Sequence, residues 1–138
     1  HVVIAPPGHP LLRRRRVTAD DLTREALLVR EPGSGTRILM ERMFEEAGLP
    51  VPAFAMEIGS NETIKQAVMA NMGLSFLSQR TIRHELAAGY MVLLDVVDTP
   101  IQGKWQVIHL KNKKLSPTLK AFKHFLLEQG GALIDTWS

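Results

Sequence analysis

Short apolar runs alternate with helix-like stretches through the first hundred residues, and this alternation constrains the fold more than any other feature. The apolar runs are predicted strands: Val2–Ala5, Leu27–Arg30, Phe54–Ile58, Leu74–Leu77 and Val92–Val96. Periodicity and helix-start signals predict helices between them at Asp20–Thr23, Thr36–Ala47, around Ile64–Met72 and at Gln79–Ala88. Such alternation predicts an α/β fold with a mostly parallel sheet, covered by helices that make right-handed crossovers.

The last third of the chain has a different pattern. Lys104–Leu110 is predicted to be a strand, and the charged run Lys111–Lys114 is predicted to be a loop. A final helix is expected to begin with Ser116 as N-cap and Pro117 at the first helical position, because this pair is a strong start signal. We expect that helix to end at Gly130–Gly131.

Composition indicates one globular domain with a sizeable core. The chain has 138 residues, of which 45% are hydrophobic and 22% are charged. It contains no cysteine, which excludes disulfides, thiolate metal sites and cysteine nucleophiles. Neither a secretory leader nor an apolar run long enough to span a membrane is present, so we expect a cytoplasmic protein. The chain starts directly in a predicted strand, so we also expect it to be part of a longer protein.

The basic excess is local rather than spread over the chain. The formal net charge is +3, and much of it comes from Arg13–Arg16 and from the lysines of Lys111–Lys114. A nucleic-acid surface is one interpretation of the arginine run. A solvated loop is favoured, because no aromatic residues interleave with these arginines to stack on bases.

The stretch Arg30–Arg37 is typical of a strand, a glycine-rich turn and a helix start. Gly33 and Gly35 allow a sharp turn, and the unpaired N–H groups of the following helix attract anions. The hydroxyls of Ser34 and Thr36 and the flanking arginines add donors for carboxylate, sulfate or phosphate oxygens. The alternative is an ordinary capped helix, with Ser34 or Thr36 as N-cap and the arginines in solvent. Neither standard nucleotide-binding glycine fingerprint is present.

A second strand runs directly into a helix at Gly59–Glu62. Ser60, Asn61 and Thr63 supply short polar side chains there, and Glu62 supplies a carboxylate. Capping by Ser60 or Asn61 is expected, and it does not exclude ligand binding. Because parallel sheets bind ligands at the carboxyl ends of their strands, the two helix starts together predict a ligand site.

Signals for catalysis or metal binding are weak. The five histidines are scattered, with no His-x-x-x-His or Glu-x-x-His pairing, and each is interpreted as a surface or structural residue. Gly33-Ser34-Gly35 is too short to be a Gly-x-Ser-x-Gly nucleophile turn. We therefore expect no catalytic residue, no metal and no cofactor.

The order of motifs resembles a known family, the effector-binding domain of LysR-type transcriptional regulators, which has the type 2 periplasmic-binding-protein fold. The resemblance covers nearly the whole chain, and its most specific parts are Arg30–Arg37 and Met56–Val68. Further parts are Ala5–Leu11, Gly73–Ser78, Glu85–Gly89 and Leu115–Pro117. The amino-acid sequences of these two parts are most similar to the subgroup that regulates RuBisCO and other carbon-fixation operons.

The resemblance implies a division of the chain. Residues 1–7 would be a crossover strand, residues 8–100 effector-binding subdomain II, and residues 101–138 the returning strand and C-terminal helix of subdomain I. The winged helix-turn-helix, the linker helix and the first half of subdomain I would lie outside this chain.

The resemblance also implies a function and a site. The chain would sense a small anionic, possibly phosphorylated, metabolite, without enzymatic activity, in a homo-oligomeric regulator that binds DNA through the missing domain. Carried over by position, the effector-binding residues are Ala5, Pro6, Arg30, Ser34, Gly35, Thr36, Ser60, Asn61 and Glu62. The alternatives are an extracytoplasmic solute-binding protein of the same fold and a phosphate-handling enzyme.

Overall fold

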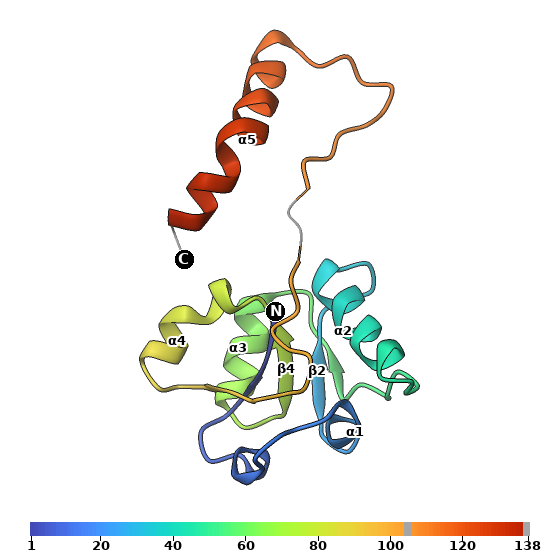
Figure 1. Ribbon diagram of the computed structural model, residues 1–138, viewed down its shortest axis with the longest axis vertical. Coiled ribbons are helices and arrows are strands. Elements are labelled where there is room, and N and C mark those ends of the chain that lie inside the picture. Colours follow the sequence, from blue (N-terminus) through green and yellow to red (C-terminus); the bar gives the residue numbers. More distant parts are fainter. Residues whose placement is uncertain (104–105, 137–138) are drawn as a thin grey trace. The chain divides into compact units, whose positions relative to one another are not determined.

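The computed structural model describes residues 1–103 and 106–136, and the chain forms two compact units, His1–Gly103 and Lys104–Ser138. The first unit contains a five-stranded sheet with strand order β3-β2-β4-β1-β5. Figure 1 labels two of its neighbouring strands, β2 and β4. The strands are β1 Val2–Ala5, β2 Leu27–Val29, β3 Met56–Glu57, β4 Leu74–Leu77 and β5 Val92–Leu93. β2 is parallel to β3 and β4, whereas β1 is antiparallel to both β4 and β5. Four strands therefore share one direction, which confirms the predicted mostly parallel α/β sheet, and β1 alone runs against them.

Four α-helices and two 3₁₀ turns accompany this sheet. They are η1 Pro10–Arg13, α1 Ala19–Leu22, α2 Gly35–Glu46, α3 Asn61–Met69, η2 Gln79–Ile82 and α4 Arg83–Ala87. The helix predicted at Gln79–Ala88 is thus split into a 3₁₀ turn and a short α-helix. The strand predicted at Val92–Val96 is shorter than expected: the Leu94 N–H makes a last hydrogen bond to Val3 of β1, and Val96 instead forms an isolated bridge with Val17.

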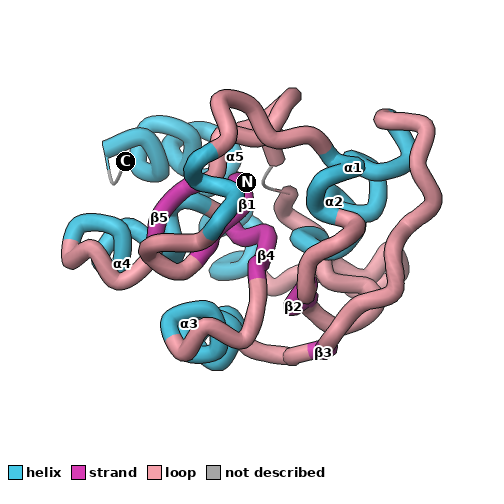
Figure 2. Tube along the Cα trace, turned by 90° about the horizontal axis from the view of Figure 1, so that it is seen from below, coloured by secondary structure: helices cyan, strands magenta, loops and turns pink. Residues whose placement is uncertain are grey.

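Both faces of the sheet are covered, which explains why β1, β2 and β4 are buried at every position. Side chains of a strand alternate between faces, so Val3 packs with Met43 and Phe44 of α2, while Ile4 packs on the other face with Ile64 of α3. Figure 2 shows the strands lying between α2 and α3. The apolar faces predicted for these two helices therefore form the core.

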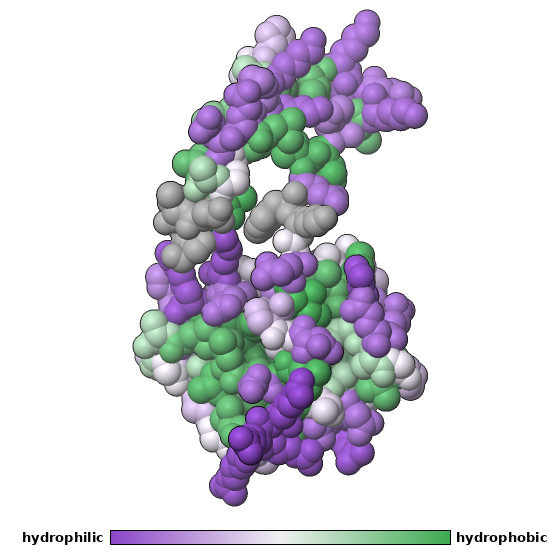
Figure 3. All heavy atoms as spheres, in the orientation of Figure 1, coloured by the Kyte–Doolittle hydropathy of each residue, from purple (hydrophilic) through white to green (hydrophobic). Residues whose placement is uncertain are grey.

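The arginine run lies in a solvated loop, as predicted. Arg13–Arg16 are all exposed, between buried Leu11 and buried Val17. Arg14 pairs with Asp21, whose carboxylate also completes the capping box of α1 with Thr18. Figure 3 shows the strongly hydrophilic surface at this end of the first unit.

The second unit is dominated by α5, Pro117–Thr136. Its start is as predicted, because the Ser116 Oγ accepts a hydrogen bond from the Leu119 backbone N–H at 3.3 Å. Its end differs from the prediction: the helix continues through Gly130–Gly131, where the apolar residues that follow extend the helical pattern at a cost of about 1 kcal/mol per glycine.

The strand predicted at Lys104–Leu110 is not found. Lys104 and Trp105 lie outside the described residues, and Gln106–Leu110 are exposed and have no strand geometry. A strand needs a neighbouring strand for its backbone hydrogen bonds, and the sheet pairings of the described residues include none for this segment. No helix within residues 1–103 and 106–136 has the length and hydropathy needed to cross a membrane.

Gly73 is a position where the fold requires glycine. Its φ is +156°, and an added Cβ would lie 2.3 Å from the Ala26 carbonyl oxygen, which accepts the Leu74 N–H that starts the pairing of β4. We expect Gly73→Ala to lower the free energy of unfolding by about 2–4 kcal/mol in urea denaturation. Gly59→Ala is the matched control, since an added Cβ there meets no atom within 4 Å. Equal stability of the two variants would contradict this account of the β4 start.

Candidate functional site

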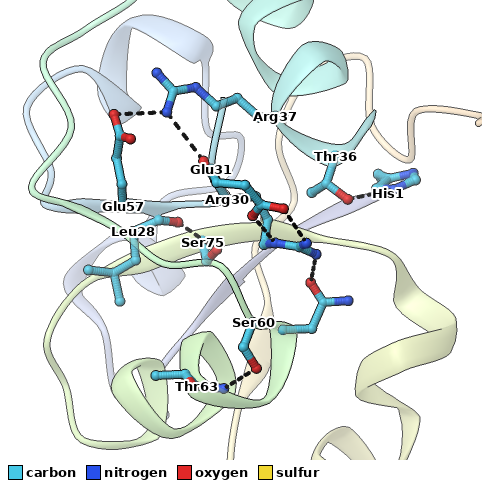
Figure 4. Close-up of polar contacts among 11 residues, drawn as sticks. His1, Leu28, Arg30, Glu31, Thr36, Arg37, Glu57, Ser60, Thr63 and Ser75 are labelled. Atoms are coloured by element: carbon cyan, nitrogen blue, oxygen red, sulfur yellow. Dashed lines mark hydrogen bonds and ion pairs between the residues drawn. The ribbon is translucent and has the colours of Figure 1, made fainter. Parts of the chain in front are cut away.

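The candidate site lies where β2 and β3 end and the chain enters two helices. β2 and β3 are parallel with Val29 opposite Glu57, so their carboxyl ends lie side by side. After β2 the chain turns at Ser34 into α2, and after β3 it turns at Ser60 into α3. The unpaired N–H groups of both helix starts therefore belong to the same edge of the sheet (Figure 4).

The Arg30 guanidinium joins the two loops. Its Nη1 donates to the Asn61 Oδ1 at 2.5 Å, across 31 positions of sequence. Its Nε and Nη2 donate to the two carboxylate oxygens of Glu31 at 2.7 and 2.9 Å. These hydrogen bonds to Arg30 are the main reason that the pKa of Glu31 is lowered. The guanidinium thus already accommodates a carboxylate in bidentate geometry, which is also suited to a ligand oxyanion.

Arg37 stabilises the same edge of the sheet through two ion pairs. Its Nε pairs with Glu41 at 2.7 Å and its Nη1 with Glu57 at 2.9 Å, and the guanidinium carbon lies 4.7 Å from the centre of the Phe54 ring. Nη1 also donates to the Arg30 carbonyl oxygen at 3.3 Å. The hydrogen bonds that Arg37 donates to Glu41 and, second, to Glu57 raise the pKa of Arg37. Its role is therefore to fix α2 against β2 and β3.

The two predicted caps behave differently. The Ser60 Oγ accepts the Thr63 N–H at 3.4 Å, so Ser60 is an N-cap as expected. Ser34 occupies the N-cap position of α2, but its side chain makes no capping hydrogen bond. Thr36 lies inside the first turn, and its hydroxyl faces His1 (Figure 4). The capping-only interpretation therefore fits Ser60 and does not fit Ser34 or Thr36.

Glu62 lies in the first turn of α3 beside Asn61. Its side chain is 74% exposed, and its carboxylate pairs with the Lys65 Nζ at 2.7 Å. Gly35, the first residue of α2, would bring an added Cβ near no other atom within 4 Å, so the space around it is open. The structure thus brings together seven of the nine predicted site residues: Arg30, Ser34, Gly35, Thr36, Ser60, Asn61 and Glu62.

Ala5 and Pro6 are not brought to this edge. Because β1 is antiparallel to β4, its first residues lie beside the end of β4, with Val2 opposite Leu77. Ala5 is at the other end of β1, fully buried and paired with Val92. A strand of four residues spans about 13 Å, so a small ligand bound near Arg30 would not reach Ala5 or Pro6. The structure therefore places these two residues at the opposite end of β1 from Arg30, apart from the other seven.

His1 lies at the site in their place. Its ring stacks on Phe76, with centroids 5.5 Å apart and planes at 22°, and its Nε2 is 3.4 Å from the Thr36 Oγ1. Sequence analysis interpreted each histidine as a surface or structural residue. The direction of β1, which brings His1 to this edge, has no sequence signal of its own.

Lys65 is a second residue that sequence analysis missed. Its side chain is only 7% exposed, and its ammonium pairs with Glu62 at 2.7 Å and Glu85 at 2.8 Å and donates to the Thr81 carbonyl oxygen at 3.3 Å. Burial alone would lower the pKa of Lys65, but the two carboxylates outweigh burial and raise it. The signal available in the sequence was a lysine next to Ile64 on the buried side of a clear amphipathic helix. Lys65 ties α3, which starts at the site, to η2 and α4.

Comparison with known proteins gives a family and several relatives. The model of the LysR substrate binding domain matches residues 1–131. The transcriptional regulator CbbR of Xanthobacter flavus is 54% identical over 135 residues, which are 97% of this chain and 40% of that protein. CfxR of Cupriavidus necator is 48% identical over 128 residues, which are 93% of this chain and 40% of that protein. The chain thus spans about two fifths of these relatives.

Solved structures give the same fold. The regulatory domain of CcmR from Synechocystis PCC6803, solved in complex with 2-PG, is 38% identical to this chain with a TM-score of 0.76. The match covers 92% of this chain and 61% of the CcmR chain. The effector-binding domain of QuiR in complex with shikimate has a TM-score of 0.70 at 23% identity, and the match covers 95% of this chain and 61% of the QuiR chain.

Within the described residues, no group of three or more histidine, aspartate or glutamate side chains could hold a metal ion.

Replacing Lys65 would leave the Glu85 carboxylate without its cation. Lys65 contacts Oε1 of that carboxylate, and Oε2 is buried without a hydrogen-bond partner among the described residues. We expect Lys65→Met to lower the free energy of unfolding at pH 7 by about 2–4 kcal/mol, and Lys65→Met/Glu85→Gln to recover much of the loss.

The same pair predicts how this loss depends on pH. The hydrogen bond from Lys65 lowers the pKa of Glu85, so its contribution to stability is present above the ordinary value of 4.5 and is lost as the pH falls through the lower folded value. In denaturant titrations, the loss of unfolding free energy caused by Lys65→Met should therefore become smaller in acid, where Glu85 is protonated without cost. A deficit that stays constant with pH would show that packing, and not charge, is the role of Lys65.

Proposed function

This chain belongs to the LysR substrate-binding domain family, and we propose that it is the effector-sensing part of a longer transcriptional regulator whose effector is a small anionic, phosphorylated metabolite. The relatives of which it spans about two fifths are named as transcriptional regulators. This favours a regulator over an extracytoplasmic solute-binding protein or a phosphate-handling enzyme. DNA binding and homo-oligomer formation would be properties of the longer protein.

The observation that carries the proposal is the Arg30 guanidinium between two helix starts. Each helix start carries partial positive charge and N–H groups without intrahelical partners. Arg30 holds the loops together through Asn61 and lies where an anion between them would be bound. The Ser34 hydroxyl makes no capping hydrogen bond, so it can donate to the ligand. These donors suit a group with several oxygens, such as phosphate, better than a single carboxylate.

The CcmR regulatory domain supports this ligand class. It is 38% identical to this chain and was solved in complex with 2-PG, which is 2-phosphoglycolate, a small phosphorylated anion. We propose that the same kind of ligand binds here through Arg30, the turn Ser34–Thr36 and the turn Ser60–Glu62. The backbone N–H groups of both turns, rather than the Glu62 carboxylate, would contact the phosphate.

We also propose the domain division implied by the family. Residues 1–7 would be the crossover strand, residues 8–100 subdomain II and residues 101–138 part of subdomain I. The compact unit His1–Gly103 is consistent with a boundary near residue 100. The rest of subdomain I would then come from the part of the protein that precedes this chain.

The two helix starts allow a test that separates binding from capping. Thr36→Val and Ser34→Ala remove hydroxyls that cap nothing, so each should weaken binding of 2-phosphoglycolate about ten- to a hundredfold with little change in melting temperature. Ser60→Ala removes a cap that is in use, and it should cost about 1 kcal/mol of stability. Calorimetric titrations and thermal melts of the full-length protein measure both quantities.

The result that would overturn the proposal is the opposite pattern. If Thr36→Val and Ser34→Ala bind 2-phosphoglycolate as tightly as the unmodified protein but melt at lower temperature, the turn serves only the helix. If all three variants and the unmodified protein fail to bind it, this ligand class is wrong.

A further inference from the structure

The His1 ring is held in a defined position at the proposed anion site. The backbone of His1 pairs with Ile101 in both directions, with the Ile101 N–H 2.9 Å from the His1 carbonyl oxygen and the His1 backbone nitrogen 2.6 Å from the Ile101 carbonyl oxygen. One face of the ring stacks on Phe76. At Gly103 an added Cβ would lie 3.1 Å from the His1 Cε1, so the ring occupies space that a larger residue there would reduce. The ring therefore has little freedom to turn.

The fixed ring directs Nε2 at the hydroxyl of Thr36, 3.4 Å away (Figure 4). A threonine hydroxyl has one proton to donate and can accept from other donors. A neutral ring whose Nε2 carries no proton accepts the hydrogen bond of that hydroxyl. A protonated ring always carries a proton on Nε2 and donates it to the Thr36 oxygen, which leaves the hydroxyl proton free to point elsewhere. Protonation of His1 thus removes the tautomer that accepts from Thr36, and leaves the hydroxyl proton of Thr36 free for another acceptor.

We propose that His1 is a positioning residue for the anion site, acting through Thr36. The protonated imidazole donates to the Thr36 Oγ1, the hydroxyl then donates to the bound anion, and the imidazolium adds positive charge at the same edge. This inference rests on the proposed function, because it needs an anion at the turn Ser34–Thr36. Its consequence is that affinity for the anion rises as the pH falls through the titration range of His1.

The groups around His1 favour assigning such a pH dependence to its ring. Thr36, Phe76 and Gly103, which contact or flank the ring, do not titrate near neutral pH, and the His1 backbone nitrogen is directed at Ile101. The charged residues of the same edge are paired, Arg30 with Glu31 and Glu62 with Lys65. Histidine is the side chain that ordinarily titrates between about pH 5 and 8.

The test compares His1→Gln with the unmodified full-length protein. 2-Phosphoglycolate is titrated calorimetrically at several values from about pH 5.5 to about pH 8.5, and the ratio of the two dissociation constants cancels the titration of the phosphate itself. We expect His1→Gln to bind roughly three- to tenfold more weakly at the acid end and about equally at the alkaline end. In a Thr36→Val background, the same substitution should change the affinity less than about twofold.

The possible outcomes separate this inference from the proposed function. If the unmodified protein does not bind 2-phosphoglycolate at any pH, both are overturned. If it binds and the ratio is constant with pH, only the role of His1 is overturned. If the ratio depends on pH but is unaffected by Thr36→Val, His1 acts by charge alone and the positioning role is wrong.

A second measurement keeps the inference testable should His1→Gln fail to fold. The pKa of the His1 imidazole is followed by NMR in the unmodified protein, with and without saturating 2-phosphoglycolate. Because linkage is reciprocal, a pKa that rises on binding is expected, and an unchanged pKa would overturn the inference.

Discussion

The hydrogen bond between Arg30 and Asn61 is the interaction on which the site depends. It joins the turn after β2 to the turn after β3, which are separated by 31 positions in the sequence. Parallel pairing of these strands brings the two turns near each other, and Arg37 fixes the helix behind them through Glu41 and Glu57. Two helix starts with unpaired N–H groups are thereby held at one edge, which neither helix could provide alone.

The sequence was most informative where local chemistry and periodicity agree. The turn Arg30–Arg37 predicted a strand, a glycine-rich turn and a helix, and the structure has β2 and then α2 beginning at Gly35. Ser60 or Asn61 was predicted as one N-cap and Ser116 as another, and the side chains of Ser60 and Ser116 accept the expected hydrogen bonds. These features depend on residues within a few positions of one another, so a single sequence contains the information needed to predict them.

The sequence was uninformative where a structural feature depends on a residue or strand far away in the sequence. Nothing within Val2–Ala5 states that this strand runs against its neighbours, and that direction decides whether Ala5 or His1 lies at the site. Lys65 lies on the buried side of a predicted helix, but its partner Glu85 is 20 residues away, so the sequence does not identify the ion pair. The segment Gln106–Leu110 has the composition of a strand, but a strand also requires a partner, which the described residues do not supply.

The central claim is that one anion contacts both turns at the edge formed by β2 and β3. A crystal structure of the full-length protein with 2-phosphoglycolate tests it most directly. The account predicts phosphate oxygens within hydrogen-bonding distance of the Arg30 guanidinium and of backbone N–H groups in both Ser34–Thr36 and Ser60–Glu62. A phosphate bound by only one of these turns, or at the opposite edge near Ala5, would contradict it.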